Sequence, residues 1–134
     1  MDDGPRISPT SMRIARPVRE IAASVHFYVD LVGLQHLGGF DGHDGYSGAF
    51  VGVQGADWHL EFTSGPNGSP TPTPTDEDLL VLYLPAEQVG TTATRLRAAG
   101  STAVGHENPY WAAVGAIVFR DPDRYLLVLC PVGG

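Results

Sequence analysis

The chain has 134 residues, a length that fits one domain with a core large enough to need no disulfide. Its net charge of −7 would repel nucleic acid, and no apolar run approaches the ~20 residues that cross a bilayer. The acidic N-terminus lacks a signal-peptide pattern and Cys130 is the only cysteine. We therefore expect a cytoplasmic protein that binds neither nucleic acid nor membrane.

The first half of the chain predicts a strand, an amphipathic helix and three further strands. Residues 1–11 are rich in Pro, Ser and Asp and are expected to form a disordered tail. Apolar residues then recur at helical spacing until Gly33, which suits a helix end. The predicted elements are a strand at 12–18, a helix at 20–32, and strands at 34–40, 49–54 and 58–63.

The second half repeats this order after a segment rich in Pro, Thr, Gly and Ser at 64–78, which is predicted to form no packed element. The predicted elements are a strand at 79–84, a helix between Pro85 and Gly100, a strand at 102–104, a loop at 106–111, and hairpin strands at 114–120 and 125–130. The pattern therefore predicts an α+β domain over 12–134, built from two βαβββ modules at 12–63 and 79–131.

Three stretches add a family resemblance to this pattern. They are the helical segment 21–28 with Gly33-Leu34 after it, the strand Trp58-His59-Leu60-Glu61-Phe62-Thr63, and the hairpin Phe119-Arg120-Asp121-Pro122-Asp123-Arg124-Tyr125. In this order and spacing the chain resembles the vicinal oxygen chelate superfamily, which includes glyoxalase I, bleomycin-resistance proteins and extradiol dioxygenases. The resemblance implies curved mixed sheets around a shared cavity, and a homodimer. Arg124 stands where relatives usually have glycine, so we expect it in a left-handed conformation.

The resemblance also implies where a divalent metal would bind. Metal-dependent members place ligands at four inward strand positions, which correspond here to Arg13, Glu61, Leu79 and Val128. A guanidinium cannot ligate a cation, and Leu and Val have no lone pair to offer. No metal and no cofactor are therefore expected. A divalent metal held by His59, Glu61 and the distant His43 is the alternative.

His59 and Glu61 form the polar pair that stands out in the sequence. At i, i+2 on a strand both side chains face the same way, while Trp58, Leu60 and Phe62 face the core. The pair can line the cavity, with His59 as proton acceptor and Glu61 as anchor, or it can be only a solvated or hydrogen-bonded pair. Arg13 is expected either to pair with Glu61 across the cavity or to meet a carboxylate of the ligand.

Tyr110 and Trp111 lie in a loop that can border the cavity mouth in this fold. They can supply a stacking wall for a planar or cationic ligand, or simply pack over the sheet. The ligand-binding candidates are thus Arg13, His59, Glu61, Tyr110 and Trp111.

Two functions of different class follow from these residues. The first is a metal-free protein that sequesters or handles a small organic ligand in the cavity, as bleomycin-resistance proteins do; the acidic balance would suit a cation. The second is a lyase, isomerase or dioxygenase-like enzyme that uses His59 and Glu61 as catalytic residues. A regulatory domain without ligand chemistry is a third reading, because one scaffold hosts many chemistries.

Overall fold

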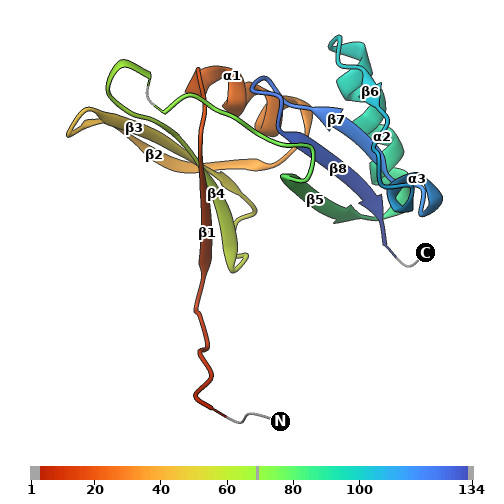
Figure 1. Cartoon of the computed structure of the whole chain (residues 1–134), viewed down its shortest axis with the longest axis horizontal. Coiled ribbons are helices and arrows are strands. Elements are labelled where there is room, and N and C mark those ends of the chain that lie inside the picture. The colour runs from red at the N-terminus through yellow and green to blue at the C-terminus, as the bar shows by residue number, and fades with distance from the viewer. Residues whose placement is uncertain (1–3, 69, 133–134) are drawn as a thin grey trace.

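The computed structural model describes residues 4–68 and 70–132, which form two four-stranded sheets with helices packed on them (Figure 1). The first module contains β1 (Met12–Pro17), α1 (Ile21–Val25), the π-helix η1 (His26–Leu31), β2 (Gln35–His43), β3 (Tyr46–Gly52) and β4 (Trp58–Ser64). The linker and second module contain the 3₁₀ turn η2 (Pro66–Gly68), β5 (Leu79–Leu84), α2 (Ala86–Ala98), β6 (Ala103–Val104), α3 (Tyr110–Ala113), β7 (Ile117–Arg120) and β8 (Leu126–Pro131). None of the helices in these ranges is long and apolar enough to cross a membrane.

The two sheets repeat one strand order, which confirms the duplicated α+β architecture. The first runs β1-β4-β3-β2 and the second β5-β8-β7-β6. In each sheet the first and last strands of the module are parallel neighbours, with Arg13 beside His59 in one sheet and Val81 beside Val128 in the other. The opening strand of each module is therefore an edge strand whose only strand neighbour, among the described residues, is the closing strand of its own sheet.

A single hydrophobic core joins the helix-covered faces of both sheets. Because side chains alternate along a strand, Leu60 and Phe62 of β4 face this core, as do Leu127 and Leu129 of β8. The helices contribute fully buried side chains to the same cluster, among them Leu96. The modules thus pack through their helical sides, and the opposite faces of the sheets point away from this core.

Several hydrogen bonds between the modules converge on the turn that joins β7 to β8, in addition to those from Arg95 of α2 to the carbonyls of Leu31 and Val32. The Tyr28 hydroxyl donates to Asp121 over 2.7 Å, and the backbone N–H of Arg19 donates to Asp123 over 3.0 Å. In return Tyr125 donates its hydroxyl to the carbonyl of Pro17 over 3.2 Å. The turn that carried the resemblance therefore fixes the second module against the first.

Several predicted boundaries were wrong, for local reasons. The helix predicted at 20–32 changes from α to π geometry at His26, where the N–H of Val32 reaches the carbonyl of Phe27. The strands predicted at 34–40 and 49–54 extend toward each other as β2 and β3, because Asp44 and Gly45 both have positive φ and form a tight turn between them.

The two loop segments also differ from expectation. The loop at 106–111 and the strand from 114 give way to α3 and a turn at Gly115 (φ 84°), so β7 starts only at Ile117. The linker contains η2 and buries Pro72, so it does pack against the domain. Residues 4–11, part of the expected tail, contain no helix or strand and run away from β1, while 1–3 lie outside the described residues (Figure 1).

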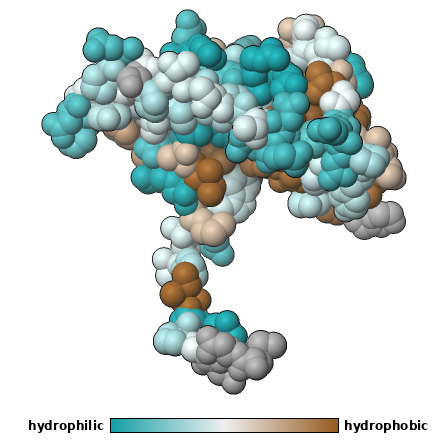
Figure 2. Space-filling model, in the orientation of Figure 1, coloured by the Kyte–Doolittle hydropathy of each residue, from teal (hydrophilic) through white to brown (hydrophobic). Residues whose placement is uncertain are grey.

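Surface polarity differs between the modules. The visible part of the first sheet around β2 and β3 is mostly hydrophilic, whereas apolar surface shows between the two sheets and on the second module (Figure 2). The exposed large apolar side chains include Met12 and Ile14 on edge strand β1 and Tyr83 on edge strand β5. Both edge strands therefore present apolar groups to solvent.

Candidate functional site

A cluster of polar and aromatic side chains lies on the face of the first sheet opposite α1. Its members are Arg13 on β1, Phe50 on β3, and His59 and Glu61 on β4, and we call them the open-face cluster. The register places Arg13 beside His59 and Phe50 beside Glu61. Strand alternation then brings all four side chains to one face.

The Arg13 guanidinium contacts every other member of the open-face cluster. Its Nε donates to His59 Nε2 over 3.0 Å, and its Cζ lies 4.6 Å from the centre of the Phe50 ring. Its Nη1 lies 3.7 Å from Glu61 Oε1, an ion pair without a hydrogen bond. The expected Arg13–Glu61 pair is therefore present, but between neighbouring strands of one sheet and not across a cavity.

The hydrogen bond from Arg13 assigns the protonation of His59. Since Nε2 accepts from a guanidinium, it carries no proton, and the neutral ring then holds its proton on Nδ1. The same ring meets Phe50 edge-on, with centroids 5.7 Å apart. His59 can accept a substrate proton at Nε2 only after Arg13 has moved, which disfavours the predicted role of proton acceptor.

Glu61 is mostly buried, and its carboxylate oxygens retain a little contact with solvent. It is 8% exposed, and no described residue donates a hydrogen bond to its carboxylate. A Cβ added at Gly48 would lie 3.3 Å from Glu61 Oε2 and 2.7 Å from the Phe40 ring, so the glycine is what lets the ring and the carboxylate come close together over β3. The carboxylate therefore retains most of its capacity to accept hydrogen bonds.

The donor set does not fit the metal site that the fold family implies. On the second sheet, Leu79 and Val128 belong to an apolar cluster with Val81 and Cys130 or pack against it. Glu61 is then the only one of the four inward positions that can ligate a cation. His43, the third ligand of the alternative site, lies at the β2–β3 hairpin beside Asp44, and no group of three ligating side chains forms within 4–68 and 70–132.

Tyr110 and Trp111 lie on the second module, away from the open-face cluster. Tyr110 is exposed and borders a cavity of about 500 Å³ with Tyr83 and Cys130. Trp111 packs against the apolar cluster, and its Nε1 is buried without a hydrogen-bond partner in the described chain. Because α3 lies at the far end of the second sheet from β1 and β4 (Figure 1), one chain does not bring the five predicted ligand-binding residues together.

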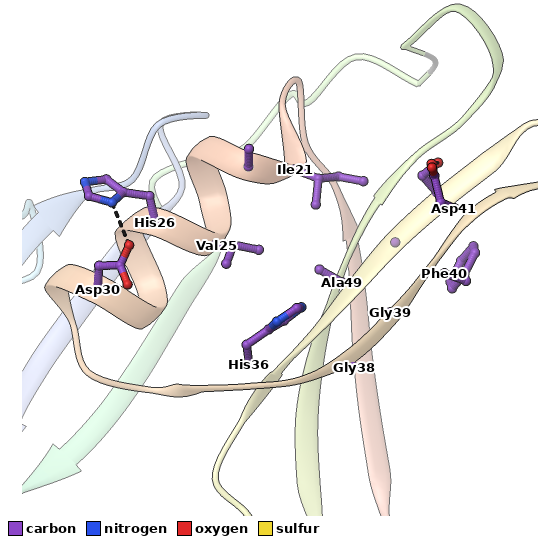
Figure 3. Close-up of a pocket in the computed structure, with 13 residues that line it drawn as sticks. Ile21, Val25, His26, Asp30, His36, Gly38, Gly39, Phe40, Asp41 and Ala49 are labelled. Atoms are coloured by element: carbon purple, nitrogen blue, oxygen red, sulfur yellow. Dashed lines mark hydrogen bonds and ion pairs between the residues drawn. The ribbon is translucent and has the colours of Figure 1, made fainter.

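Another cavity, of about 710 Å³, opens on the helix-covered side of the first sheet, between α1 and strands β2 and β3. Figure 3 shows Ile21 and Val25 facing Ala49 across it, with His36 at its base. At its rim His26 Nδ1 lies 2.8 Å from Asp30 Oδ2. The sequence analysis gave these residues no role, although their i, i+4 spacing could have revealed the pair.

The comparisons with known proteins bear on this geometry. A family model described as the YycE-like N-terminal domain matches residues 12–63, and one described as the YycE-like C-terminal domain matches residues 77–130. The chain belongs to the YycE-like family. It is 38% identical to the uncharacterized protein YycE of Bacillus subtilis (strain 168) over 118 residues, which cover 87% of this chain and 84% of that protein.

Solved structures place the family within the glyoxalase and bleomycin-resistance fold. The crystal structure of Bacillus subtilis YycE, a protein of unknown function named in connection with glyoxalases and fosfomycin resistance, superposes with a TM-score of 0.86 at 36% identity, covering 94% of this chain and 92% of that one. TnmS3, an antibiotic-binding protein from Streptomyces sp. CB03234, superposes with a TM-score of 0.68 at 26% identity, covering 96% and 98%. The predicted superfamily and fold are thereby confirmed.

Proposed function

We propose that the chain is a metal-free protein that binds a small organic ligand against the open-face cluster. The observation that carries the proposal is the position of Arg13, which stands at an expected ligand position and contacts His59, Phe50 and Glu61. The positive charge of Arg13 would compete with a divalent cation for the same carboxylate, and no further ligating side chain among the described residues stands beside it to favour the metal. An antibiotic-binding protein among the fold neighbours agrees with a binding role.

Binding is favoured over catalysis by the state of His59. An enzyme that uses this ring as a base needs a free lone pair aimed at the substrate. Here the lone pair on Nε2 accepts a hydrogen bond from Arg13, and Glu61 has no donor that would orient it as a partner base. A lyase, isomerase or dioxygenase-like activity remains the alternative that the experiment below tests.

The proposed binding unit is a symmetric homodimer in a reducing, cytoplasmic compartment. In one chain the open-face cluster is uncovered, and the edge strands β1 and β5 expose Met12, Ile14 and Tyr83. A second copy that covers these groups would remove them from water and enclose the cluster against an apolar sheet. The free, buried thiol of Cys130 suits a reducing environment.

Metal analysis of the purified protein is the first test. We expect no stoichiometric metal, no thermal shift with Ni²⁺, Zn²⁺, Mn²⁺ or Fe²⁺, and the mass of a dimer by light scattering. Stoichiometric bound metal, removed together with an activity by EDTA, would contradict the proposal and support the enzyme.

A second test locates the ligand. Small aromatic compounds that raise the melting temperature of the wild type should lose that effect in His59→Ala. The matched control is His36→Ala, because His36 lines the cavity on the other side of the same sheet. Loss of binding in His36→Ala but not in His59→Ala would move the site to that cavity.

A further inference from the structure

We infer that Arg13 is an internal occupant of the ligand position and that the ligand is an organic cation whose N–H groups replace the Arg13 guanidinium beside Glu61. This inference rests on the proposed function and names the chemical class that the open-face cluster would accept.

The first argument is the unmet hydrogen-bonding capacity of Glu61. The Glu61 carboxylate accepts no hydrogen bond from the described residues, and its ion-pair partner, Arg13 Nη1, lies 3.7 Å away, so its oxygens are left to the little water that reaches them. That separation lies beyond hydrogen-bond range. An ammonium, amidinium or guanidinium group of a ligand could approach more closely and donate directly.

The second argument is the aromatic wall beside the carboxylate. The Phe50 ring already holds a cation over its face, with Arg13 Cζ 4.6 Å from its centre. The Phe40 ring follows at 6.0 Å between centroids. Because Gly48 has no side chain, the Phe40 ring packs directly over the strand and comes near the Glu61 carboxylate. Arg13 thus shows which charge this surface accommodates.

The third argument is that Arg13 can leave. Its side chain is 49% exposed, on an edge strand, and its one hydrogen bond goes to the neutral ring of His59. An anionic ligand is the opposite possibility, since Arg13 could bind a carboxylate. Such a ligand would be placed close to the buried charge of Glu61, whose repulsion would oppose it.

Three probes of one shape and different charge test the inference: benzamidine (cationic), benzamide (neutral) and benzoate (anionic). Their affinities are measured by calorimetric titration of the full chain as wild type, Glu61→Gln and Arg13→Ala. Arg13→Met keeps the length of the side chain in case Arg13→Ala fails to fold. Arg6→Ala, in the exposed segment before β1, is the control for the loss of one positive charge.

We expect benzamidine to bind more tightly than benzamide, and benzoate least. Glu61→Gln should weaken benzamidine by about tenfold or more, because a charge-assisted hydrogen bond is lost. Arg13→Ala and Arg13→Met should tighten it, since no internal cation then competes, and Arg6→Ala should leave it unchanged.

Two results would overturn the inference. The first leaves the proposed small-molecule function standing, and the second contradicts that function as well. If benzoate binds best, or if Arg13→Ala weakens benzamidine, Arg13 is a ligand contact and the proposed small-molecule site still stands. If none of the three probes binds to the wild type or to either Arg13 variant, the proposed function falls with the inference.

Discussion

The hydroxyl of Tyr28 donates a 2.7 Å hydrogen bond to the carboxylate of Asp121, and both side chains are buried. Tyr28 belongs to the π-helix of the first module and Asp121 to the β7–β8 turn of the second. The same carboxylate accepts the backbone N–H groups of Asp123 and Tyr125. This one contact therefore links the helix of one module to the turn that shapes the other.

Removing the hydroxyl should destabilise the whole domain. Tyr28→Phe leaves a buried carboxylate without its side-chain donor, which we expect to lower the free energy of unfolding by about 1–3 kcal/mol. Urea denaturation followed by circular dichroism measures the change. Tyr46→Phe, on an exposed side chain at the start of β3, serves as the control and should change stability little. Equal effects from the two substitutions would show that the Tyr28–Asp121 bond does not hold the modules together.

The pH dependence of the free energy of unfolding should also reveal that Asp121 is buried. Burial raises the pKa of the Asp121 carboxyl above its ordinary value, although hydrogen bonds from Tyr28 and the backbone oppose the rise. When the folded-state pKa lies above the unfolded-state pKa, the contribution to stability is complete below the unfolded value and is lost as the pH rises through the folded value.

The free energy of unfolding of the wild type, relative to Asp121→Asn, should therefore fall as the pH rises from below the ordinary aspartate pKa of about 4 toward neutrality. Denaturation curves of both proteins across this range test the sign. A difference that grows with pH would mean that the donors around Asp121 outweigh its burial.

Two glycines of the chain should respond to alanine in opposite directions. A Cβ at Gly39 in β2 would lie 2.5 Å from the carbonyl oxygen of Gly48, a backbone atom that cannot yield, so Gly39→Ala should cost about 1–3 kcal/mol. Gly90 lies inside α2, with no atom within 4 Å of the added Cβ. Gly90→Ala should therefore stabilise the domain by about 0.5–1 kcal/mol. Thermal unfolding of both variants measures the two effects. A melting temperature that does not fall in Gly39→Ala, or does not rise in Gly90→Ala, would contradict the corresponding expectation.

Arg124 adopts the left-handed conformation that the resemblance led us to expect, with φ of 74°. The guanidinium of Arg120 donates a hydrogen bond to the backbone carbonyl of Arg124, so this contact does not depend on the Arg124 side chain. Arg124→Gly should therefore raise stability by about 1 kcal/mol, because the strain at a residue with a Cβ is removed. Arg124→Ala retains the strain and is the matched control. A gain in the alanine variant as large as in the glycine variant would place the effect in the side chain and not in the backbone.

Glu61→Gln should yield a protein at least as stable as the wild type. An amide is easier to bury than a carboxylate that lacks hydrogen-bond donors, and the gain is expected at up to about 1 kcal/mol. Urea denaturation of the ligand-free protein measures it. A clear loss of stability would mean that the ion pair with Arg13 supports the fold, so that Glu61 would be retained for structure.

Much of the fold could be predicted because its signals are local. The inner stripe of the second helix, with Val89, Ala93 and Leu96, is buried as its helical spacing indicates. Leu60 and Phe62 face the core, as strand alternation requires. The change to π geometry at His26 and the late start of β7 after the turn at Gly115 were missed.

The candidate site was harder to predict, because its geometry depends on strand order. His59 and Glu61 share a face through simple alternation along one strand, which a sequence reveals. The hydrogen bond from Arg13 to His59 exists only because β1 lies parallel to β4 with these two residues in register. Phe50 comes from the strand on the other side of β4. The short turn at 55–57 predicts the pairing of β3 with β4 as a hairpin, whereas no local pattern indicates that β1 lies beside β4.

The alternation of side chains along β4 separates two tasks within one strand. Leu60 and Phe62 pack in the core, while His59 and Glu61, which alternate with them along the strand, face the other way. Substitutions at the second pair leave the buried contacts of the first unchanged. Proteins with this fold could therefore evolve specificity for a new ligand through substitutions at a few outward-facing positions, while every intermediate sequence remains folded.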